Sequence, residues 1–265
     1  MENLRNKYGQ WAFVLGATDG IGKSFCEYFA RRQMDVILVG RRAEKLNELA
    51  KSLEKDYKVN TIVLPQDLST DNAAETLIEK VKDLDIGVLN YVACYHTMGR
   101  YFKKSYEEHK KVLNVNVNTY SKLLYHFSRV FFENNRGAIV TMSSLTAFTG
   151  NPFNAEYGAT KSYMQIVTES LGYEFKDTNV DVIVITAGST KTPTWLQNQP
   201  KGEAAKNNDN AMFPEEVVED GMAQLGKKWS HIAGEKNRTA YDKYIKQMTR
   251  DEVTATFGGF FTHEA

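Results

Sequence analysis

The sequence contains little cysteine and little proline, and it has no excess of charge of either sign. Two cysteines, Cys26 and Cys94, among 265 residues argue against a disulfide framework and favour a reducing compartment, so we expect a cytoplasmic protein. Only five prolines are present, and no linker divides the chain. Lys plus Arg (33) equals Asp plus Glu (33), which argues against binding to nucleic acid or to an anionic membrane through bulk charge.

Long hydrophobic runs are also absent. No run approaches the roughly 18 apolar residues that span a bilayer, and residues 1–7 lack the apolar core of an export signal. We therefore expect a soluble protein that is neither exported nor inserted in a membrane. Hydrophobic residues still make up 42% of the chain, which predicts a sizeable packed core rather than disorder.

The sequence does contain a regular alternation of short β-rich runs with longer amphipathic stretches. Some runs are almost wholly apolar, such as residues 36–39 and 182–185, as parallel strands covered by helices on both faces require. The pattern predicts one α/β domain over residues 1–265, doubly wound, with a seven-stranded parallel sheet and helices on both faces. The predicted strands are residues 11–16, 35–40, 60–64, 86–92, 138–142, 181–186 and, with a weaker signal, 230–233.

Two segments depart from this alternation. Residues 198–209 are polar and end in an Asn-rich stretch, so we expect a surface loop or lid over about 194–213, beside the substrate. After about residue 236 we expect a helical tail, with a polar helix near 240–248 and a Phe-rich end. So aromatic an end is unfavourable in water, and we expect the tail to pack on its own subunit or on a neighbour, near the substrate cleft.

A glycine-rich turn joins the first predicted strand to the following helix. Glycines allow backbone N–H groups to approach a pyrophosphate, and a helix N-terminus adds roughly half a positive charge there. The spacing Gly-x-x-x-Gly-x-Gly is not the commoner one, and such a turn can also be steric relief between a strand and a helix. The candidate phosphate-binding residues are Gly16, Thr18, Asp19, Gly20, Ile21 and Gly22.

The second predicted strand ends at Arg41 and Arg42, where a site for NAD would usually carry an acidic residue. Two guanidinium groups there can bind a 2′-phosphate through charge-assisted hydrogen bonds, which favours NADP(H). Alternatively, they are solvated arginines at the start of a surface helix. Beyond the third strand, Asp67 and Leu68 could meet the adenine through the carboxylate or the adjacent amide, or Asp67 could cap the next helix.

A tyrosine, a lysine and a serine form the main catalytic candidate. Tyr157 and Lys161 are four residues apart, which places them on one face of a helix, but Tyr106 and Lys110 share this spacing. The difference is that Ser144 stands thirteen residues before Tyr157, at the end of the fifth predicted strand, whereas no serine stands at that distance from Tyr106. Because open α/β sheets bind ligands at the carboxyl ends of their strands, strand and helix can converge on one crevice.

These residue types suit the reduction of a ketone by a nicotinamide, which needs hydride delivery, a donor to the developing alkoxide and a proton source. A phenol has a pKa of about 10, and we expect the cation of Lys161, together with the oxidised nicotinamide, to lower the pKa of Tyr157. Ser144 would donate to the substrate oxygen. The alternative is a helix pair without function and a serine that caps the strand end.

In order and spacing these motifs resemble the short-chain dehydrogenase/reductase family over nearly the whole chain. The resemblance rests on the glycine turn, Ser144, Tyr157, Lys161 and the later run at residues 187–193. It implies a Rossmann-type domain and an oxidoreductase. It also implies that Asn116 is a fourth catalytic residue, which bends a helix and holds a water near the lysine. Further cofactor contacts are implied for Ala93, Gly188, Thr190 and Thr192, beside those of Tyr157 and Lys161.

Two segments depart from the family pattern. Where most members have Asn-Asn-Ala-Gly after the fourth strand, residues 91–94 read Tyr-Val-Ala-Cys, which removes the usual polar support near the cofactor ribose. The Pro-Gly after the sixth strand is replaced by Ala187 and Gly188. Both departures concern the cofactor contacts and leave Ser144, Tyr157 and Lys161 in place.

Several segments are similar to one group within the family, the bacterial NADP-dependent 7β-hydroxysteroid dehydrogenases of bile acids. They are residues 7–11, 34–42, 91–96 and 232–235, together with the Phe-rich tail. The resemblance implies reversible interconversion of a bile-acid hydroxyl and ketone by a homodimer or homotetramer. A dehydrogenase for another ring position such as 12β could share these segments. A 3-oxoacyl reductase shares fold and cofactor, and an idle NADP-binding protein is the non-enzymatic alternative.

A sterol is flat and apolar, so its cleft should be lined by aromatic and aliphatic side chains with a few polar ones. We expect His96 either to touch a polar group of the substrate or to be a satisfied loop histidine. No metal site is expected, because the other histidines show no ligand spacing with the cysteines. The expected substrate contacts are Tyr95, Phe148, Asn151, Trp195 and Leu196, with Phe260 or Phe261 as a lid.

Overall fold

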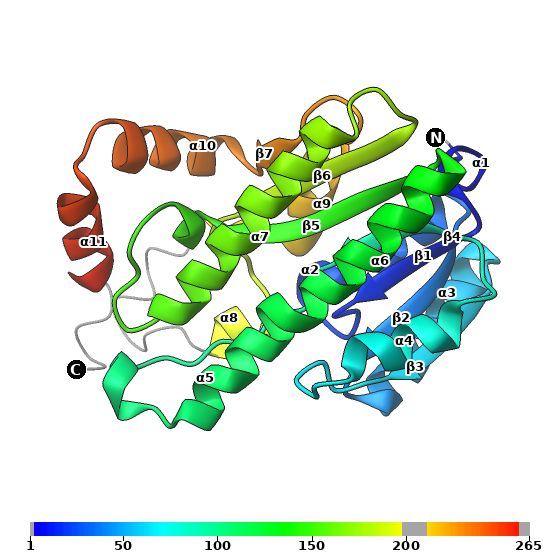
Figure 1. The fold of residues 1–265 in the computed structure, drawn as a ribbon, viewed down its shortest axis with the longest axis horizontal. Coiled ribbons are helices and arrows are strands. Elements are labelled where there is room, and N and C mark those ends of the chain that lie inside the picture. The colour runs from blue at the N-terminus through cyan, green and yellow to red at the C-terminus, as the bar shows by residue number, and fades with distance from the viewer. Residues whose placement is uncertain (1–2, 198–210, 260–265) are drawn as a thin grey trace.

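The computed structural model describes residues 3–197 and 211–259. Its seven strands form one sheet in the order β3-β2-β1-β4-β5-β6-β7, and every neighbouring pair is parallel (Figure 1). This confirms the predicted α/β class with a seven-stranded parallel sheet. The strands are β1 (Trp11–Leu15), β2 (Asp35–Gly40), β3 (Thr61–Pro65), β4 (Ile86–Tyr91), β5 (Gly137–Ser144), β6 (Val180–Ala187) and β7 (Ser230–Ile232).

The predicted strand boundaries agree with the structure to within one or two residues. The largest difference is at β5, which continues to Ser144 because Ser143 and Ser144 pair with Thr186 and Ala187 of β6. Two serines interrupt the apolar run there, so the sequence pattern ends before the hydrogen-bonded ladder does. Ser144 is therefore the last residue of β5 rather than a residue beyond it.

Helices cover both faces of the sheet, as predicted, because the strand residues alternate between two cores. Along β1, Ala12 and Val14 point into one core, whereas Phe13 and Leu15 point into the other. The second core lies under the helices in front in Figure 1, α6 and α7. The first face carries α1 (Leu4–Tyr8), α2 (Gly20–Arg31), α3 (Ala43–Tyr57) and α9 (Pro214–Met222), and the second carries α4 (Ala73–Val81), α6 (Thr119–Asn134) and α7 (Ala155–Glu174).

One long helical segment leads from the carboxyl edge of the sheet along its second face. It begins as α5 (Tyr106–Leu113) with a capping box, in which Ser105 and Glu108 satisfy each other's backbone N–H groups. A π-helical turn, η2 (Asn114–Asn118), follows directly and continues into α6 without an intervening loop. Single π turns inside helices are frequently found at functional sites.

The C-terminal part of the described chain packs against the loop after β5. That loop begins with η3 (Leu145–Phe148), and the ring of Phe148 meets the edge of Tyr241 at a centroid distance of 4.7 Å. The Thr254 hydroxyl lies 3.4 Å from that of Thr149. The tail thus packs on its own chain, as one of two predicted alternatives. It comprises α10 (Glu235–Tyr241), η5 (Asp242–Lys246) and α11 (Arg250–Gly259).

Some of the predicted loop and tail cannot be compared with the structure. The predicted polar helix at 240–248 corresponds in part to α10 and η5, and α11 lies within the predicted helical tail. The predicted lid residues Phe260 and Phe261 lie outside the described residues, as do residues 198–210 of the predicted loop. That loop begins with α8 (Pro193–Gln197). Within the described ranges, no helix is both long and apolar enough to cross a membrane.

Candidate active site

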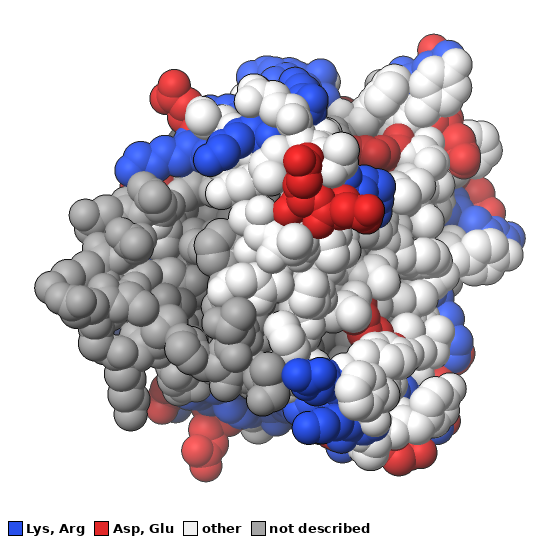
Figure 2. Space-filling model, turned by 90° about the vertical axis from the view of Figure 1, so that its left-hand side faces the viewer, with Lys and Arg blue, Asp and Glu red and all other residues white. Residues whose placement is uncertain are grey.

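A cleft of about 560 Å³ opens where the carboxyl ends of the strands meet the first turns of α2 and α7. Figure 2 shows this end of the molecule; in its coloured part, Lys and Arg gather at the upper and lower margins, and a small group of Asp and Glu interrupts the uncharged surface between them. The cleft brings together every residue that the sequence analysis assigned to the cofactor. These are Gly16, Thr18, Asp19, Gly20, Ile21, Gly22, Arg41, Arg42, Asp67, Leu68, Ala93, Tyr157, Lys161, Gly188, Thr190 and Thr192.

The glycine turn is tightly packed, and its glycines are needed for that packing. Gly16 has a φ of +95°, and a Cβ there would lie 2.7 Å from the backbone nitrogen of Ala93. A Cβ on Gly22 would lie 1.9 Å from the carbonyl oxygen of Gly16. Steric relief and phosphate binding are therefore compatible interpretations: the glycines let β1 and α2 approach closely, and the turn that results borders the cleft.

The two arginines after β2 differ in their surroundings. Arg42 pairs with the carboxylate of Asp19 from the glycine turn, and Lys45 lies 3.3 Å from the same carboxylate. Arg41 is exposed at the cleft, and its positive charge helps to lower the pKa of the nearby Asp67 carboxyl group. A 2′-phosphate at this place would meet Arg41 directly, whereas Arg42 would have to share its charge with Asp19.

Asp67 does not cap a helix, because α4 begins at Ala73. Its Oδ1 instead accepts hydrogen bonds from the amide of Ser69 at 2.9 Å and from the Ser69 hydroxyl at 2.8 Å. Partial burial opposes ionisation, but these bonds and the charge of Arg41 hold the pKa of Asp67 below its usual value. Asp67 thus shapes the turn that ends at the cleft and remains ionised.

Ser144, Tyr157 and Lys161 all line the same cleft. Ser144 ends β5, and its Oγ accepts the amide of Thr146 at 3.3 Å, so it caps the turn η3 as one of the alternatives predicted. The Ser144 side chain also hydrogen-bonds to Tyr157. Ser144 is thus both a cap and a partner of the phenol, and its expected hydrogen bond to a substrate oxygen stays a prediction.

The structure corrects the expected direction of the Tyr157 pKa. Burial raises this pKa above its ordinary value of 10.0, and the hydrogen bond from Ser144 opposes that increase only in part. Lys161 does not lower it by contact, because its Nζ donates to the carbonyl oxygen of Met142 at 2.8 Å and lies 5.8 Å from the centre of the Tyr157 ring. The sequence argument counted the charge of the lysine and left out the loss of water around the phenol.

Lys161 is itself almost fully buried, with 2% of its surface exposed. Burial lowers its pKa, and the nearby Cys94 thiol acts in the opposite direction. Apart from the Met142 carbonyl, the ammonium has the sulfur of Met164 at 3.7 Å. This leaves the lysine fixed at the floor of the cleft by its own helix and by β5.

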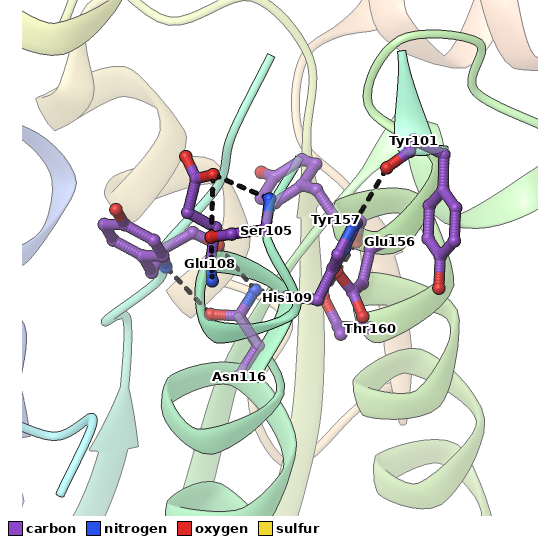
Figure 3. Close-up of polar contacts among 9 residues, drawn as sticks. Tyr101, Ser105, Glu108, His109, Asn116, Glu156, Tyr157 and Thr160 are labelled. Atoms are coloured by element: carbon purple, nitrogen blue, oxygen red, sulfur yellow. Dashed lines mark hydrogen bonds and ion pairs between the residues drawn. The ribbon is translucent and has the colours of Figure 1, made fainter. Parts of the chain in front are cut away.

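Asn116 lies in the π-helical turn and links two walls of the cleft. Its Oδ1 accepts the Tyr95 amide at 2.8 Å, and its Nδ2 donates to the Tyr95 carbonyl at 2.9 Å and to the Thr160 hydroxyl at 2.9 Å. Figure 3 shows Asn116 directed toward Thr160, one turn after Tyr157 on α7. The side-chain amide is thus engaged by the loop after β4 and by α7.

Tyr91, which stands where most family members have an asparagine, supports the same π-helical turn. The Tyr91 hydroxyl donates to the carbonyl oxygen of Val115, which lies inside η2. The ring of Tyr91 also packs edge-on against Tyr120 of α6 at a centroid distance of 5.0 Å. In place of an asparagine facing a ribose, this chain therefore uses a buried tyrosine that supports the irregular helix.

Only part of the expected substrate site lies in the cleft. Tyr95 and Trp195 line it. Phe148 packs instead against Tyr241 of the tail, and Asn151 is buried with its amide directed to the carbonyl of Thr146. Leu196 is 57% exposed and does not line the described cleft. The tail helices pack on the side of the loop where Phe148 was expected to face substrate.

Two further residues line the cleft: His96, for which the sequence left two interpretations open, and Asn154, which was not predicted. His96 packs against Tyr157 at a centroid distance of 5.7 Å, and its Nδ1 is buried without a hydrogen-bond partner. Burial and the charge of Lys161 lower the His96 pKa. Asn154, just before α7, also has a buried and unpaired oxygen, Oδ1, and it faces the same cleft. Only its position directly before the helix of Tyr157 could have indicated from the sequence that Asn154 lies at the cleft. Among the described residues no cluster of side chains suits a metal ion.

Known proteins that are similar to this chain include dehydrogenases. The family described as "short chain dehydrogenase" matches residues 10–202. A "7beta-hydroxysteroid dehydrogenase" of Clostridium sardiniense is 51% identical over 263 residues, 99% of this chain and 100% of that protein. The protein of the same name from Collinsella aerofaciens is 42% identical, over 98% of this chain and 99% of its own length.

The fold comparison agrees with the sequence comparison. A solved structure described as "Structural and biochemical insights into 7beta-hydroxysteroid dehydrogenase stereoselectivity" superposes with a TM-score of 0.93 at 42% identity, covering 97% of this chain and 99% of that one. The similarity extends through the cleft and the C-terminal helices alike. Because the family model, the full-length relatives and the fold all agree, this chain belongs to the short-chain dehydrogenase family.

Proposed function

We propose that this chain is an NADP(H)-dependent 7β-hydroxysteroid dehydrogenase, which interconverts the 7β-hydroxyl and 7-oxo groups of bile acids. The observation that carries the proposal is that Ser144, Tyr157 and Lys161 share one cleft with the glycine turn and Arg41. The two relatives named above support the ring position, because they match this chain over 98% or more of its length.

The residues of the cleft fit a dinucleotide with a 2′-phosphate. There is no room for a side chain at Gly16 or at Gly22, so at these two positions only backbone groups border the place for a pyrophosphate. Arg41 is exposed beside it, and no acidic residue occupies its position or that of Arg42. The bound nicotinamide supplies the hydride in reduction and accepts it in oxidation.

In reduction, the side chains of this chain hold the ketone oxygen and provide its proton. The Ser144 hydroxyl donates a hydrogen bond to that oxygen, and the Tyr157 hydroxyl transfers its proton to the developing alkoxide. Since burial keeps the phenol protonated, Tyr157 begins in the form that reduction needs. The charge of Lys161 acts on the remaining phenolate only from a distance, since its Nζ lies 5.8 Å from the centre of the Tyr157 ring. Oxidation reverses these steps, and the phenolate then takes the proton from the steroid hydroxyl.

A flat apolar substrate suits the outer part of the cleft. Tyr95 is held there through both of its backbone polar groups by Asn116, which fixes its backbone at the edge of the cleft. Trp195 lines the opposite strand end, after β6. Aromatic walls of this kind, with few polar groups between them, are typical of sites for rigid hydrophobic ligands.

We also propose that the protein forms a homodimer or homotetramer through α6 and α7, which lie side by side in Figure 1 and are joined by the Tyr163 to Ser121 hydrogen bond. Their outer surfaces expose large apolar side chains, which is unfavourable in a monomer. Sedimentation of the protein should give a dimer or tetramer; a monomer at micromolar concentration contradicts this part. The exposed side chains are Tyr125 at 66%, Phe132 at 63%, Ile166 at 62% and Tyr173 at 56%.

The reaction is tested with NADPH or NADH and a panel of 3-, 7- and 12-oxo bile acids, together with an oxoacyl thioester. We expect consumption of NADPH with the 7-oxo compounds and a strong preference for NADPH over NADH. Preferred turnover of the 3-oxo or 12-oxo compounds, or of the thioester, contradicts the proposed substrate. A preference for NADH contradicts the proposed cofactor and leaves the ring position to be judged from the products.

A further inference from the structure

His109 of α5 lies between the catalytic helix and a loop that borders the cleft. This substrate-side loop comprises residues 92–105, from the end of β4 to the start of α5, and it includes η1 (Tyr101–Lys103). Its first part lines the cleft through Tyr95 and His96. The His109 side chain is 8% exposed, and Figure 3 shows it between Tyr101 and Glu156.

Both nitrogens of the His109 ring are engaged. Nδ1 hydrogen-bonds to the carboxylate of Glu156, which directly precedes Tyr157 on α7. Nε2 lies 3.0 Å from the backbone carbonyl oxygen of Tyr101. The Tyr101 ring also lies against the imidazole at a centroid distance of 4.3 Å. A single side chain thus connects the substrate-side loop to the first turn of the catalytic helix.

This arrangement specifies the charge of the histidine. The carbonyl oxygen of Tyr101 only accepts hydrogen bonds, and so does the ionised carboxylate of Glu156. A neutral imidazole has one N–H and can satisfy one of these acceptors, whereas imidazolium has two and satisfies both. The contacts of His109 are therefore complete only when its ring is protonated.

A second side chain from the same helical segment makes an equivalent connection without charge. Asn116, two turns further on, binds the backbone of Tyr95 at the other end of the substrate-side loop and the Thr160 hydroxyl of α7. Its amide has both a donor and an acceptor, so these bonds do not depend on pH. The loop is thus held at one end by a permanent contact and at the other by a contact that titrates.

We propose that protonated His109 is a positioning residue that ties the substrate-side loop to α7, and that loss of its proton releases one of the two contacts and weakens binding of the steroid. The inference rests on the proposed function only where the KM for the steroid is measured. Cofactor binding should be unaffected, because neither His109 nor Glu156 lines the described cleft.

The charges around His109 favour the protonated form. The hydrogen bond from Glu156 raises its pKa, burial opposes this, and the Tyr101 carbonyl and the charge of Glu108 raise it further. Among the described residues, these are the groups that face the ring from α7, from η1 and from its own helix. Because the pKa is raised above its ordinary value of 6.5, both contacts are complete below pH 6.5, and one is lost as the pH rises through the folded-state pKa.

The test compares the pH dependence of the KM for the 7-oxo steroid in the natural protein and in Glu156→Gln. In the variant, the Gln amide donates to Nδ1 while Nε2–H donates to Tyr101, so a neutral histidine makes both contacts. We expect the KM of the natural protein to rise about tenfold above the His109 pKa, the effect of one charge-assisted hydrogen bond, and the KM of the variant to stay low. The same rise in both proteins contradicts the proposal.

Two further variants separate this effect from a general loss of structure. His109→Phe keeps the ring against Tyr101 but loses both hydrogen bonds, so its KM should be raised and constant over this pH range. His126→Gln, at a histidine of α6 that packs on Phe127, should keep the natural profile. A natural pH profile in His109→Phe, or a lost one in His126→Gln, contradicts the proposal.

The protonation itself is measured by NMR titration of the histidine rings, with His109 identified from its absence in His109→Phe. We expect it to lose its proton above pH 6.5, and titration at or below that value overturns the inference. This measurement needs no turnover. If no 7-oxo steroid reacts at any pH, the proposed function fails, and the NMR titration alone decides whether His109 carries the proton.

Discussion

Lys161 and Tyr157 share one face of α7, yet the ammonium of Lys161 donates to the Met142 carbonyl at 2.8 Å and lies 5.8 Å from the centre of the Tyr157 ring. The phenol therefore has no direct contact with the cation, and burial determines its protonation. A protein in this state holds Tyr157 as a proton donor, ready for reduction.

The direction of the Tyr157 shift predicts different pH profiles for the two reactions. Its pKa is raised, so the phenol stays protonated through neutral pH and forms phenolate only at alkaline pH. We expect kcat for ketone reduction, measured at saturating steroid, to be constant between pH 6 and 10, and kcat for oxidation of the hydroxyl to rise with pH over the same range. Initial rates between pH 6 and 10 measure both, and an oxidation rate that does not increase with pH contradicts the assignment of Tyr157 as the base.

Replacing Tyr157 with Phe should abolish most turnover and preserve the fold. Loss of general acid and base catalysis costs about 100- to 10,000-fold in kcat, whereas NADPH binding, followed by quenching of its fluorescence, should change little. Tyr106→Phe is the matched control, since Tyr106 has the same spacing to a lysine but is 74% exposed and outside the cleft. Equal losses in both variants would show that the loss is not specific to Tyr157 and would contradict its role as acid and base.

Arg41 should determine the preference for a 2′-phosphate. Its guanidinium is exposed at the cleft, and removal of one charge-assisted contact should weaken NADPH binding about 10- to 100-fold while NADH binding is unchanged. Arg129→Ala serves as the control, because Arg129 is a surface residue of α6 that pairs with Glu133. Isothermal titration with both cofactors measures the effect. An Arg41→Ala protein that keeps its preference for NADPH would refute the role of this residue.

Tyr91→Phe should destabilise the protein, because it leaves the buried Val115 carbonyl in the π-helical turn without its donor. An unsatisfied buried acceptor costs about 1–3 kcal/mol in free energy of unfolding. The control is Tyr125→Phe, whose hydroxyl belongs to a side chain that is 66% exposed on α6. Urea denaturation compares the two, and equal stabilities would mean that the Tyr91 hydroxyl does not support the turn.

The sheet and the cleft could be predicted from the sequence because their signals are local. Apolar runs such as that of β2 mark strands buried on both faces, and a glycine turn between a strand and a helix marks the ligand edge. Tyr157 and Lys161 were identified by spacing, and Ser144 by its distance from them along the chain. The comparisons confirm the family that these motifs indicated.

The remaining features depend on contacts between distant parts of the chain. The π-helical turn that carries Asn116 has no periodicity of its own over five residues, and it is supported by Tyr91 from β4. Phe148 faces the tail because of Tyr241, and the bond between His109 and Glu156 joins residues 47 positions apart. The pKa of Tyr157 required the burial of its hydroxyl, which spacing alone does not provide.

The most direct test of the account follows the hydride to its carbon. NADPH carrying deuterium at the transferable position is incubated with a 7-oxo bile acid, and the product is examined by mass spectrometry and NMR. The account predicts deuterium on C7 with the new hydroxyl in the β orientation. Deuterium on another ring carbon, a 7α-hydroxyl, or no transfer at all would contradict it.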